Sequence, residues 1–323
     1  MDKKRDHHYV FQAYLKRWTN ANEKLWCLRN GKVFEVKPRN IAFEKDFYRI
    51  APLNDKEKEF IVLFFRKSSE GFKKELQNFL NLYTTFDQSE KNFHTMCALY
   101  LHDCPEINMA LNEIDSMIDV AKNNALEDTF AVLEGEACAW LEHLCNGNVD
   151  FFYNPDDDQN EKFISFICTQ YYRTKRMKDV TLNTLKQAEE YFINDRFPKG
   201  SIKAESLYQP MLWLISSKCA DGILKARLKL LINMTDLPFI TSDQPVINTK
   251  ADYTDLSKGT TELVFYYPIS PQIAILLNDS SPEIKEEITD EINIREYNNL
   301  IYKASYNMIF SNNKEVLKEY AKS

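Results

Sequence analysis

The sequence predicts an α+β protein, with a largely helical body and a small antiparallel sheet built from an N-terminal hairpin and C-terminal strands. Asn30-Gly31 between two runs of β-forming residues is a strong hairpin signal. Apolar residues recur at helical spacing through much of residues 55–219, and strand-like alternation follows from residue 225. We expect one domain over residues 1–323, with an N-terminal helix and hairpin (1–52), a helical body (53–224) and a β-rich C-terminal part (225–323).

The first segment carries apolar residues at helical spacing, which predicts a helix over residues 7–18 capped by Asp6. His7 and His8 would then stand at the helix start, where outward-pointing amide groups favour anions. Neighbouring residues on a helix are about 100° apart, which disfavours one metal shared by both histidines. Two readings stay open: one histidine faces a site, or both form a solvated pair near the terminus.

The predicted elements follow in order. A hairpin over 25–36 and a short strand or turn near 41–48 lead to Pro52, which closes the N-terminal part. Helices are expected over 57–82, 92–102, 108–126, 126–145, 161–177 and 206–217. The acidic run 156–158 precedes one of them and is read as a helix start rather than a metal site.

The C-terminal part predicts an antiparallel sheet of about four strands, because short apolar runs alternate with turn signals. The expected strands cover 225–234, 238–242, 261–267 and 272–277. Pro282 would start a helix that ends near residue 305. A last strand over 306–311 and a polar helix over 314–322 complete the chain.

Composition excludes several classes. The net charge of −7 disfavours a globally basic nucleic-acid binder, although a local basic groove remains compatible with it. Neither GxGxxG nor GxxxxGK[ST] occurs. The cysteine count of 7 is odd and has no CxxC spacing, as in reduced intracellular proteins. With no signal peptide and no spanning apolar run, we expect a cytoplasmic protein without membrane contact.

Two stretches carry polar groups within apolar sequence. Gln170, Arg173 and Thr174 share one face of the helix over 161–177, because residues three and four apart are neighbours. Arg173 would grip a substrate phosphate or carboxylate with two hydrogen bonds, or pair with an internal carboxylate such as Asp243. The apolar strand before Thr241 runs into a turn that presents two hydroxyls and a carboxylate.

Four motifs resemble, in the same order, the bacterial DUF4238 family. They are His7-His8-Tyr9-Val10 with Tyr14-Leu15, Gln170 with Arg173-Thr174, Phe239 to Asp243 with Pro245-Val246, and Tyr267 to Pro271. The resemblance covers nearly the whole chain. Phe11 and Lys175 stand where the family tends to have proline, and Gln244 where it has asparagine. The family has no settled activity, so the resemblance implies candidate positions and no mechanism.

We expect these motifs to meet, because buried polar groups need partners. The expected catalytic residues are His7, His8, Gln170, Arg173 and Asp243. A histidine would act as general acid or base, Arg173 would hold an anion, and Asp243 would orient the histidine or bind a divalent ion. The expected substrate-binding residues are Tyr9, Thr174, Arg176, Thr241 and Ser242.

This inventory fits phosphodiester or nucleotide chemistry better than acyl transfer, because no GxSxG motif occurs. The first hypothesis is a nuclease or nucleotide-processing hydrolase, with Lys175, Arg176 and Lys178 forming a basic strip. The resemblance suggests an antiphage defence or toxin system, with a protein partner, as its context. The second is a non-catalytic module that binds an anionic ligand or a protein partner, with structural polar motifs. No ligand motif supports a metal, so the cofactor is unassigned.

Overall fold

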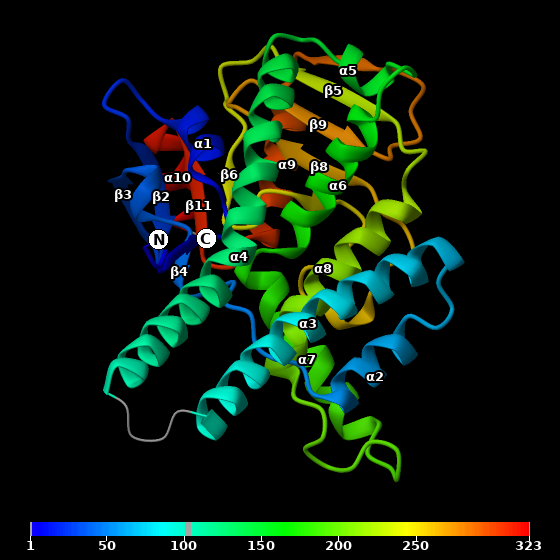
Figure 1. Cartoon of the computed structure of the whole chain (residues 1–323). Helices are drawn as coiled ribbons and strands as arrows, with labels where there is room; N and C mark the ends of the chain where they lie inside the picture. Colours follow the sequence, from blue (N-terminus) through cyan, green and yellow to red (C-terminus); the bar gives the residue numbers. More distant parts are fainter. Residues whose placement is uncertain (1, 101–104, 323) are drawn as a thin grey trace. The chain divides into compact units, whose positions relative to one another are not determined.

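The computed structural model describes residues 2–100 and 105–322 and confirms the α+β class (Figure 1). The chain forms two compact units. Unit 1 comprises Met1–His7, Lys45–Phe130 and Thr181–Leu214. Unit 2 comprises His8–Glu44, Ala131–Val180 and Ile215–Ser323. The prediction of one domain over the whole chain therefore stays a prediction.

Unit 2 contains the predicted hairpin in a four-stranded sheet of order β3-β2-β11-β6. The strands are β2 (Leu25–Arg29), β3 (Lys32–Val36), β11 (Met308–Ser311) and β6 (Thr241–Ser242). Asn30 and Gly31 have φ of 52° and 72°, the left-handed backbone that a tight hairpin turn needs. The prediction that the N-terminal hairpin and the C-terminal strands share a sheet is confirmed.

Unit 2 also contains a five-stranded sheet of order β10-β5-β9-β8-β7. The strands are β5 (Leu228–Asn233), β7 (Ile247–Asn248), β8 (Phe265–Pro268), β9 (Ile273–Leu277) and β10 (Lys285–Ile288). Helices cover both faces of this sheet. Neighbouring residues of β8 point to opposite faces, and each of them contacts a different helix. Phe265 contacts Tyr171 of α6 (Gln159–Tyr172) at 5.1 Å between ring centroids. Tyr266 stacks at 4.6 Å on Tyr297 of α9 (Glu291–Ala304).

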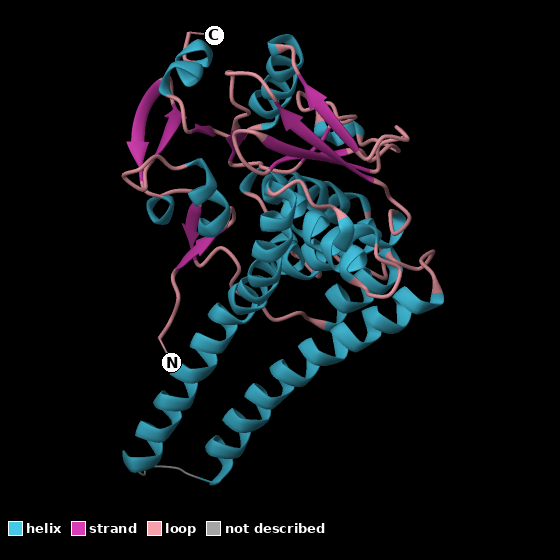
Figure 2. Cartoon of the chain, turned by 90° about the horizontal axis from the view of Figure 1, so that it is seen from above, coloured by secondary structure: helices cyan, strands magenta, loops and turns pink. Residues whose placement is uncertain are grey.

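Unit 1 is mainly helical. It contains α2 (Asp55–Phe64), α3 (Glu70–Tyr100) and the part of α4 (Pro105–Cys145) up to residue 130. Long helices α3 and α4 run side by side (Figure 2), and His94 Nε2 on α3 lies 2.8 Å from Asp115 Oδ1 on α4. Unit 1 also takes the later part of α7 (Lys175–Tyr191) and the first part of α8 (Ala204–Gly222).

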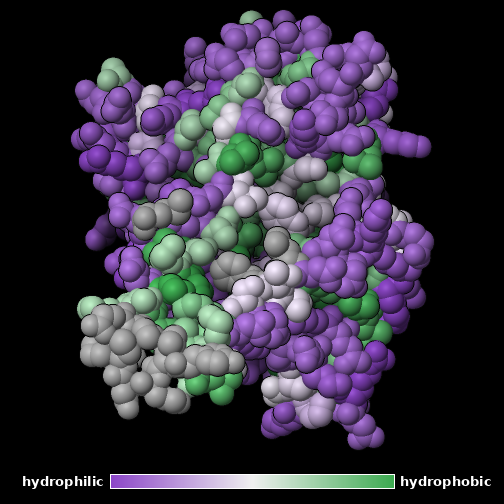
Figure 3. Space-filling view, viewed as in Figure 1, coloured by the Kyte–Doolittle hydropathy of each residue, from purple (hydrophilic) through white to green (hydrophobic). Residues whose placement is uncertain are grey.

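The remaining elements are short. They are β1 (Asp6–His8), α1 (Gln12–Leu15), η1 (Lys16–Trp18), η2 (Pro38–Asn40), β4 (Phe43–Lys45), α5 (Asp150–Tyr153), η3 (Leu256–Lys258) and α10 (Lys314–Tyr320). Hydrophilic residues predominate over the hairpin side of unit 2 in the space-filling view (Figure 3).

The predicted helix over residues 7–18 is wrong in its first part. Residues 6–8 form strand β1, and the helix begins only at Gln12, after Phe11 with φ −70° and ψ 146°. The apolar spacing at 10, 11, 14, 15 and 18 arises from a buried extended segment followed by a helical turn. His7 and His8 therefore do not stand at a helix start.

Several other predictions need correction. The helix expected over 57–82 is divided into α2 and α3, and those expected over 108–126 and 126–145 are one helix, α4. The end of the helix expected over 92–102 lies outside the described residues. The region after Pro282 first forms strand β10, which pairs in parallel with β5, and α9 begins at Glu291. The strands that were expected to form one sheet are divided between two sheets.

Candidate functional site

Gln170 and Arg173 form one hydrogen-bonded pair at the end of α6, as their spacing predicted. Gln170 Oε1 accepts from Arg173 Nε at 3.2 Å and from Nη2 at 2.9 Å. Gln170 Nε2 donates to the Tyr9 carbonyl at 3.1 Å. Arg173 Nη2 also donates to Glu134 Oε1 at 2.6 Å. The carboxylate that pairs with Arg173 is thus Glu134 on α4, where the sequence suggested Asp243.

Thr174 belongs to a second set of contacts, centred on Gln244. The Thr174 hydroxyl hydrogen-bonds to Gln244 Oε1. Gln244 Nε2 donates to the carbonyls of Tyr171 at 3.0 Å and Val246 at 2.8 Å. Ser242 Oγ donates to the Gln244 carbonyl at 2.9 Å. These contacts fix the end of α6 against the turn that follows β6.

Asp243 is fully buried and its partners are backbone amides. Oδ1 accepts from Tyr306 N at 2.8 Å, and Oδ2 accepts from Asn307 N at 2.9 Å and Met308 N at 3.0 Å. Burial raises the pKa of this carboxyl to about 6, although the three hydrogen bonds act in the opposite direction. The carboxylate therefore holds the turn between α9 and β11.

Thr241 pairs with Phe310 of β11 and contacts α1. Its Oγ1 lies 2.6 Å from the Tyr14 hydroxyl, which donates to the Pro268 carbonyl at 2.6 Å. Tyr14 also stacks on Tyr267 with ring centroids 5.0 Å apart. These contacts join the first, third and fourth motifs of the sequence.

Arg176 and Tyr9 also contact backbone. Arg176 Nη1 donates to the carbonyls of Ala304 at 3.2 Å and Ser305 at 2.7 Å, where α9 ends. Cationic side chains stabilise helix C-termini in this way. The Tyr9 amide donates to the Ala42 carbonyl at 3.1 Å.

The two histidines fall in different units. His7, in unit 1, is fully buried, and its Nδ1 accepts from Tyr48 N at 2.9 Å. Its Nε2 lies 2.7 Å from the Lys4 carbonyl and donates to it. Burial lowers the pKa of this imidazole, so the ring is held neutral. His8, in unit 2, is half-buried, and its ring centroid lies 5.3 Å from that of Phe43.

The expected site residues thus separate into several groups. Gln170 contacts Arg173 and Tyr9, and Asp243 contacts the turn before β11. His7 belongs to the other unit. The catalytic and substrate-binding roles of all these residues stay predictions. Within the described part of the chain, no group of three or more His, Cys, Asp or Glu residues could hold a metal ion.

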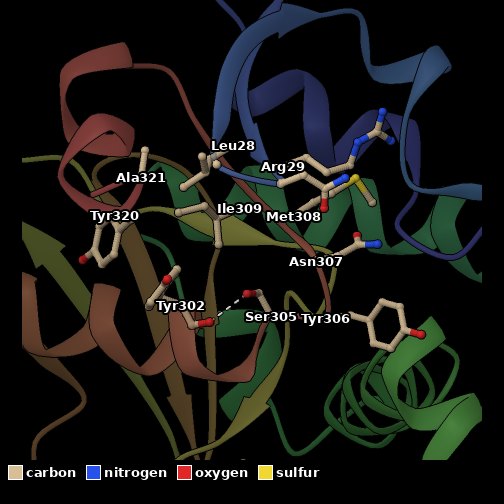
Figure 4. Close-up of a pocket in the computed structure, with 12 residues that line it drawn as sticks. Leu28, Arg29, Tyr302, Ser305, Tyr306, Asn307, Met308, Ile309, Tyr320 and Ala321 are labelled. Atoms are coloured by element: carbon tan, nitrogen blue, oxygen red, sulfur yellow. Dashed lines mark hydrogen bonds between the residues drawn. The ribbon is translucent and has the colours of Figure 1, made fainter. Parts of the chain in front are cut away.

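Sequence reasoning missed a cavity of about 480 Å³ beside the turn that Asp243 holds. We call it the tyrosine cavity. It is lined by Leu28, Arg29, Asn30, Gly31, Tyr302, Ser305, Tyr306, Asn307, Met308, Ile309, Tyr320 and Ala321. Leu28 and Ile309, which are strand partners, lie between Tyr302 and Tyr320 on one side and Asn307 on the other (Figure 4). The spacing of Tyr302 and Tyr306, four residues apart, was the one local signal in the sequence for this cavity.

These features define an α+β protein in which Asp243, in the third motif, holds a turn that lines the tyrosine cavity. The family model described as a protein of unknown function, DUF4238, matches residues 6–315, and the chain belongs to this family. Neither the curated proteins nor the solved structures contain a match to the chain. No helix within the described residues is long and apolar enough to cross a membrane.

Proposed function

We propose that this protein is a non-catalytic module that binds an anionic ligand with a planar ring, such as a nucleotide, in the tyrosine cavity. The polar motifs are then structural. The observation that carries this proposal is the contact between Asp243 and the amides of Tyr306, Asn307 and Met308. The carboxylate of the third motif shapes the wall of a cavity and does not itself face a ligand.

Burial supports the structural role of the motifs. Gln170 and Arg173 are each 1% exposed, and Thr174 and Asp243 are 0% exposed. A catalytic group must reach its substrate directly or through one water. The hydrogen-bonding capacity of these side chains is largely taken up by backbone and by one another, which is typical of buried polar networks.

The lining of the tyrosine cavity supports the choice of ligand. Among the described residues that line it, Arg29 is the one charged side chain and there is no carboxylate. Asn30 and Asn307 offer amide groups. Tyr302 and Tyr320, whose ring centroids lie 4.9 Å apart, offer aromatic surface. Tyrosine rings stack on bases, and arginine binds phosphate with two parallel hydrogen bonds. The combination fits a base linked to a phosphate better than a simple inorganic anion.

The hydrolase hypothesis stays a prediction, as does its context in an antiphage defence or toxin system. The basic strip on which it partly depended is largely compensated. Lys175 and Lys178 lie 2.8 Å and 3.5 Å from the Glu44 carboxylate. Arg176 donates to the end of α9. An anionic substrate would therefore compete with partners that are already in place.

The two functions are separated by titrating adenosine and guanosine monophosphates into the protein by calorimetry and then assaying these nucleotides and a single-stranded oligonucleotide for hydrolysis. We expect binding without turnover. Arg29→Ala and Tyr302→Ala should each weaken binding by about tenfold or more, because each removes about 1.4 kcal/mol or more of contact energy. Lys285→Ala, an exposed change on β10, is the matched control and should bind normally.

Two results together would overturn the proposal. One of these substrates is hydrolysed, and Arg173→Lys or Asp243→Asn abolishes that hydrolysis while the variant melts like the wild type. The proposal also fails if binding is present but Arg29→Ala and Tyr302→Ala bind as the control does. In that case the ligand occupies another surface.

A further inference from the structure

Unit 2 contains a second concave surface, of about 310 Å³, between the α1–η1 segment and η2. We call it the basic groove, and its charged lining residues are Lys16, Lys37, Arg39 and Glu23. It is separate from the tyrosine cavity, with which it shares no lining residue. The sequence motifs did not point to it, because the cations come from two separated segments.

The charge in the groove is opposite to that of the chain. The chain has a net charge of −7, yet three cations face one carboxylate here. Within residues 2–100 and 105–322, Lys16, Lys37 and Arg39 form no ion pair, whereas the nearby Lys24 pairs with Glu35 at 3.7 Å. Cations that converge on a concave surface without neutralising partners create a local positive potential, which attracts anions.

Both walls of the groove are fixed by buried neighbours. Lys16 follows Tyr14 and Leu15, which are 0% exposed, and the Tyr14 hydroxyl is held by Thr241 and Pro268. On the other wall, Pro38 at the start of η2 is buried between Lys37 and Arg39. The backbone that carries the cations is therefore in place before a ligand arrives, which lowers the ordering cost of binding.

We propose that the basic groove binds phosphate groups through Lys16, Lys37 and Arg39. The Arg39 guanidinium offers a planar fork that matches two phosphate oxygens, and the two lysines act as point charges. The volume admits a pyrophosphate or a short stretch of nucleic-acid backbone. This inference does not depend on the tyrosine cavity or on its ligand.

The test is calorimetric titration of sodium pyrophosphate, which has no ring for the tyrosine cavity, into the full chain. We expect binding that weakens as salt increases, because the contact is between exposed charges. The double variant Lys37→Glu with Arg39→Glu should weaken it by at least about tenfold, since it replaces two favourable charges with repulsive ones. The matched control is Lys285→Glu, an exposed cation on β10, which should bind within about twofold of wild type because a distant surface charge is largely screened.

Several outcomes would overturn the proposal. They are the absence of pyrophosphate binding, an equal loss in Lys285→Glu, or a loss in Arg29→Ala that matches the loss in the double variant. If the double variant does not fold, Lys16→Met takes its place, since Lys16 is exposed and the change keeps the length of the side chain. Binding by Lys16→Met that equals wild type then counts against the site.

Two further titrations identify the source of the phosphate. A single-stranded oligonucleotide that binds more tightly than pyrophosphate, with a steeper salt dependence, indicates a nucleic-acid backbone. Equal or tighter binding of adenosine triphosphate than of the oligonucleotide indicates a free nucleotide. Either result supports the basic groove only if the double variant binds that ligand more weakly than wild type. Undiminished affinity of the double variant overturns the proposal.

Discussion

Asp243 and Met308 are joined by hydrogen bonds in opposite directions. Met308 N donates to Asp243 Oδ2 at 3.0 Å, and Asp243 N donates to the Met308 carbonyl at 3.1 Å. The neighbouring amides of Tyr306 and Asn307 donate to the same carboxylate. This arrangement ties the turn after β6 to the start of β11, and it places a buried carboxylate directly behind a cavity wall.

The first prediction concerns the pH dependence of stability at Asp243. Burial raises the pKa of Asp243 from 3.8 to about 6. At a pH between these two values, the folded chain holds a proton on this carboxyl that the unfolded chain has lost. Stability from this group is full below about pH 4 and is lost as the pH rises through about 6. Asp243→Asn does not titrate. The free energy of unfolding of wild type minus that of Asp243→Asn should therefore fall between about pH 4 and 6 and level off above about pH 7.

Urea unfolding at intervals of about half a pH unit measures this difference, because other titrating groups are common to both proteins. A constant difference over the range would show that the three backbone hydrogen bonds offset burial at this carboxyl, and a difference that rises with pH would show that they outweigh it.

A second prediction concerns Gln170. Gln170→Leu keeps a side chain of similar size but removes the oxygen that accepts from Arg173 Nε and Nη2. A buried donor without an acceptor costs about 1–3 kcal/mol, and more when it is charged. We expect the free energy of unfolding to fall by at least that amount. Ser165→Ala, an exposed change on the same helix, should alter it by less than about 0.5 kcal/mol.

Equal stability of Gln170→Leu and Ser165→Ala would mean that Arg173 finds another acceptor, and the buried contact would then not be essential to the fold.

Local signals predicted the elements that local chemistry determines. Asn30 and Gly31 form the hairpin turn because both adopt positive φ, and Gln170 and Arg173 meet because of their spacing on α6. Strand β10 was missed because its Lys-Glu-Glu-Ile sequence has little strand character, and its conformation depends on pairing with β5.

The same distinction holds for the site. Glu134 is 39 residues from Arg173, and no local pattern connects them. The tyrosine cavity combines the hairpin turn, the turn before β11 and the end of α10, which meet only through the order of strands in the sheet. The polar motifs were visible in the sequence, but whether they face solvent or backbone is decided by tertiary packing.

A third prediction concerns His7 and unit 1. Burial lowers the pKa of His7, so the folded chain disfavours the protonated ring. The stability that this group contributes is present above its ordinary pKa of about 6.5 and is lost as the pH falls. The advantage of wild type over His7→Gln in free energy of unfolding should shrink as the pH falls below about 6.5. An advantage that is flat from pH 5 to 8 would show that folding does not lower the pKa of His7.

The last prediction concerns Arg176 of α7, which contacts the end of α9 beside the tyrosine cavity. Its guanidinium donates to Ala304, Ser305 and Tyr253 carbonyls, and Ser305 lines the cavity. Arg176→Lys keeps the charge but replaces a planar fork with one ammonium group, which cannot reach all three carbonyls together. We expect the free energy of unfolding to fall by about 1 kcal/mol for each lost hydrogen bond. We also expect nucleotide binding in the cavity to weaken, because the end of α9 is less firmly held.

Lys318→Gln on α10 is the control, since Lys318 pairs with Glu315 on the surface and exposed pairs contribute at most about 1 kcal/mol. Calorimetry and urea unfolding on the same samples separate the two effects. A loss of stability without a loss of affinity would place the ligand away from Ser305. A loss of affinity with unchanged stability would mean that Arg176 contacts the ligand directly, as its predicted role in substrate binding requires.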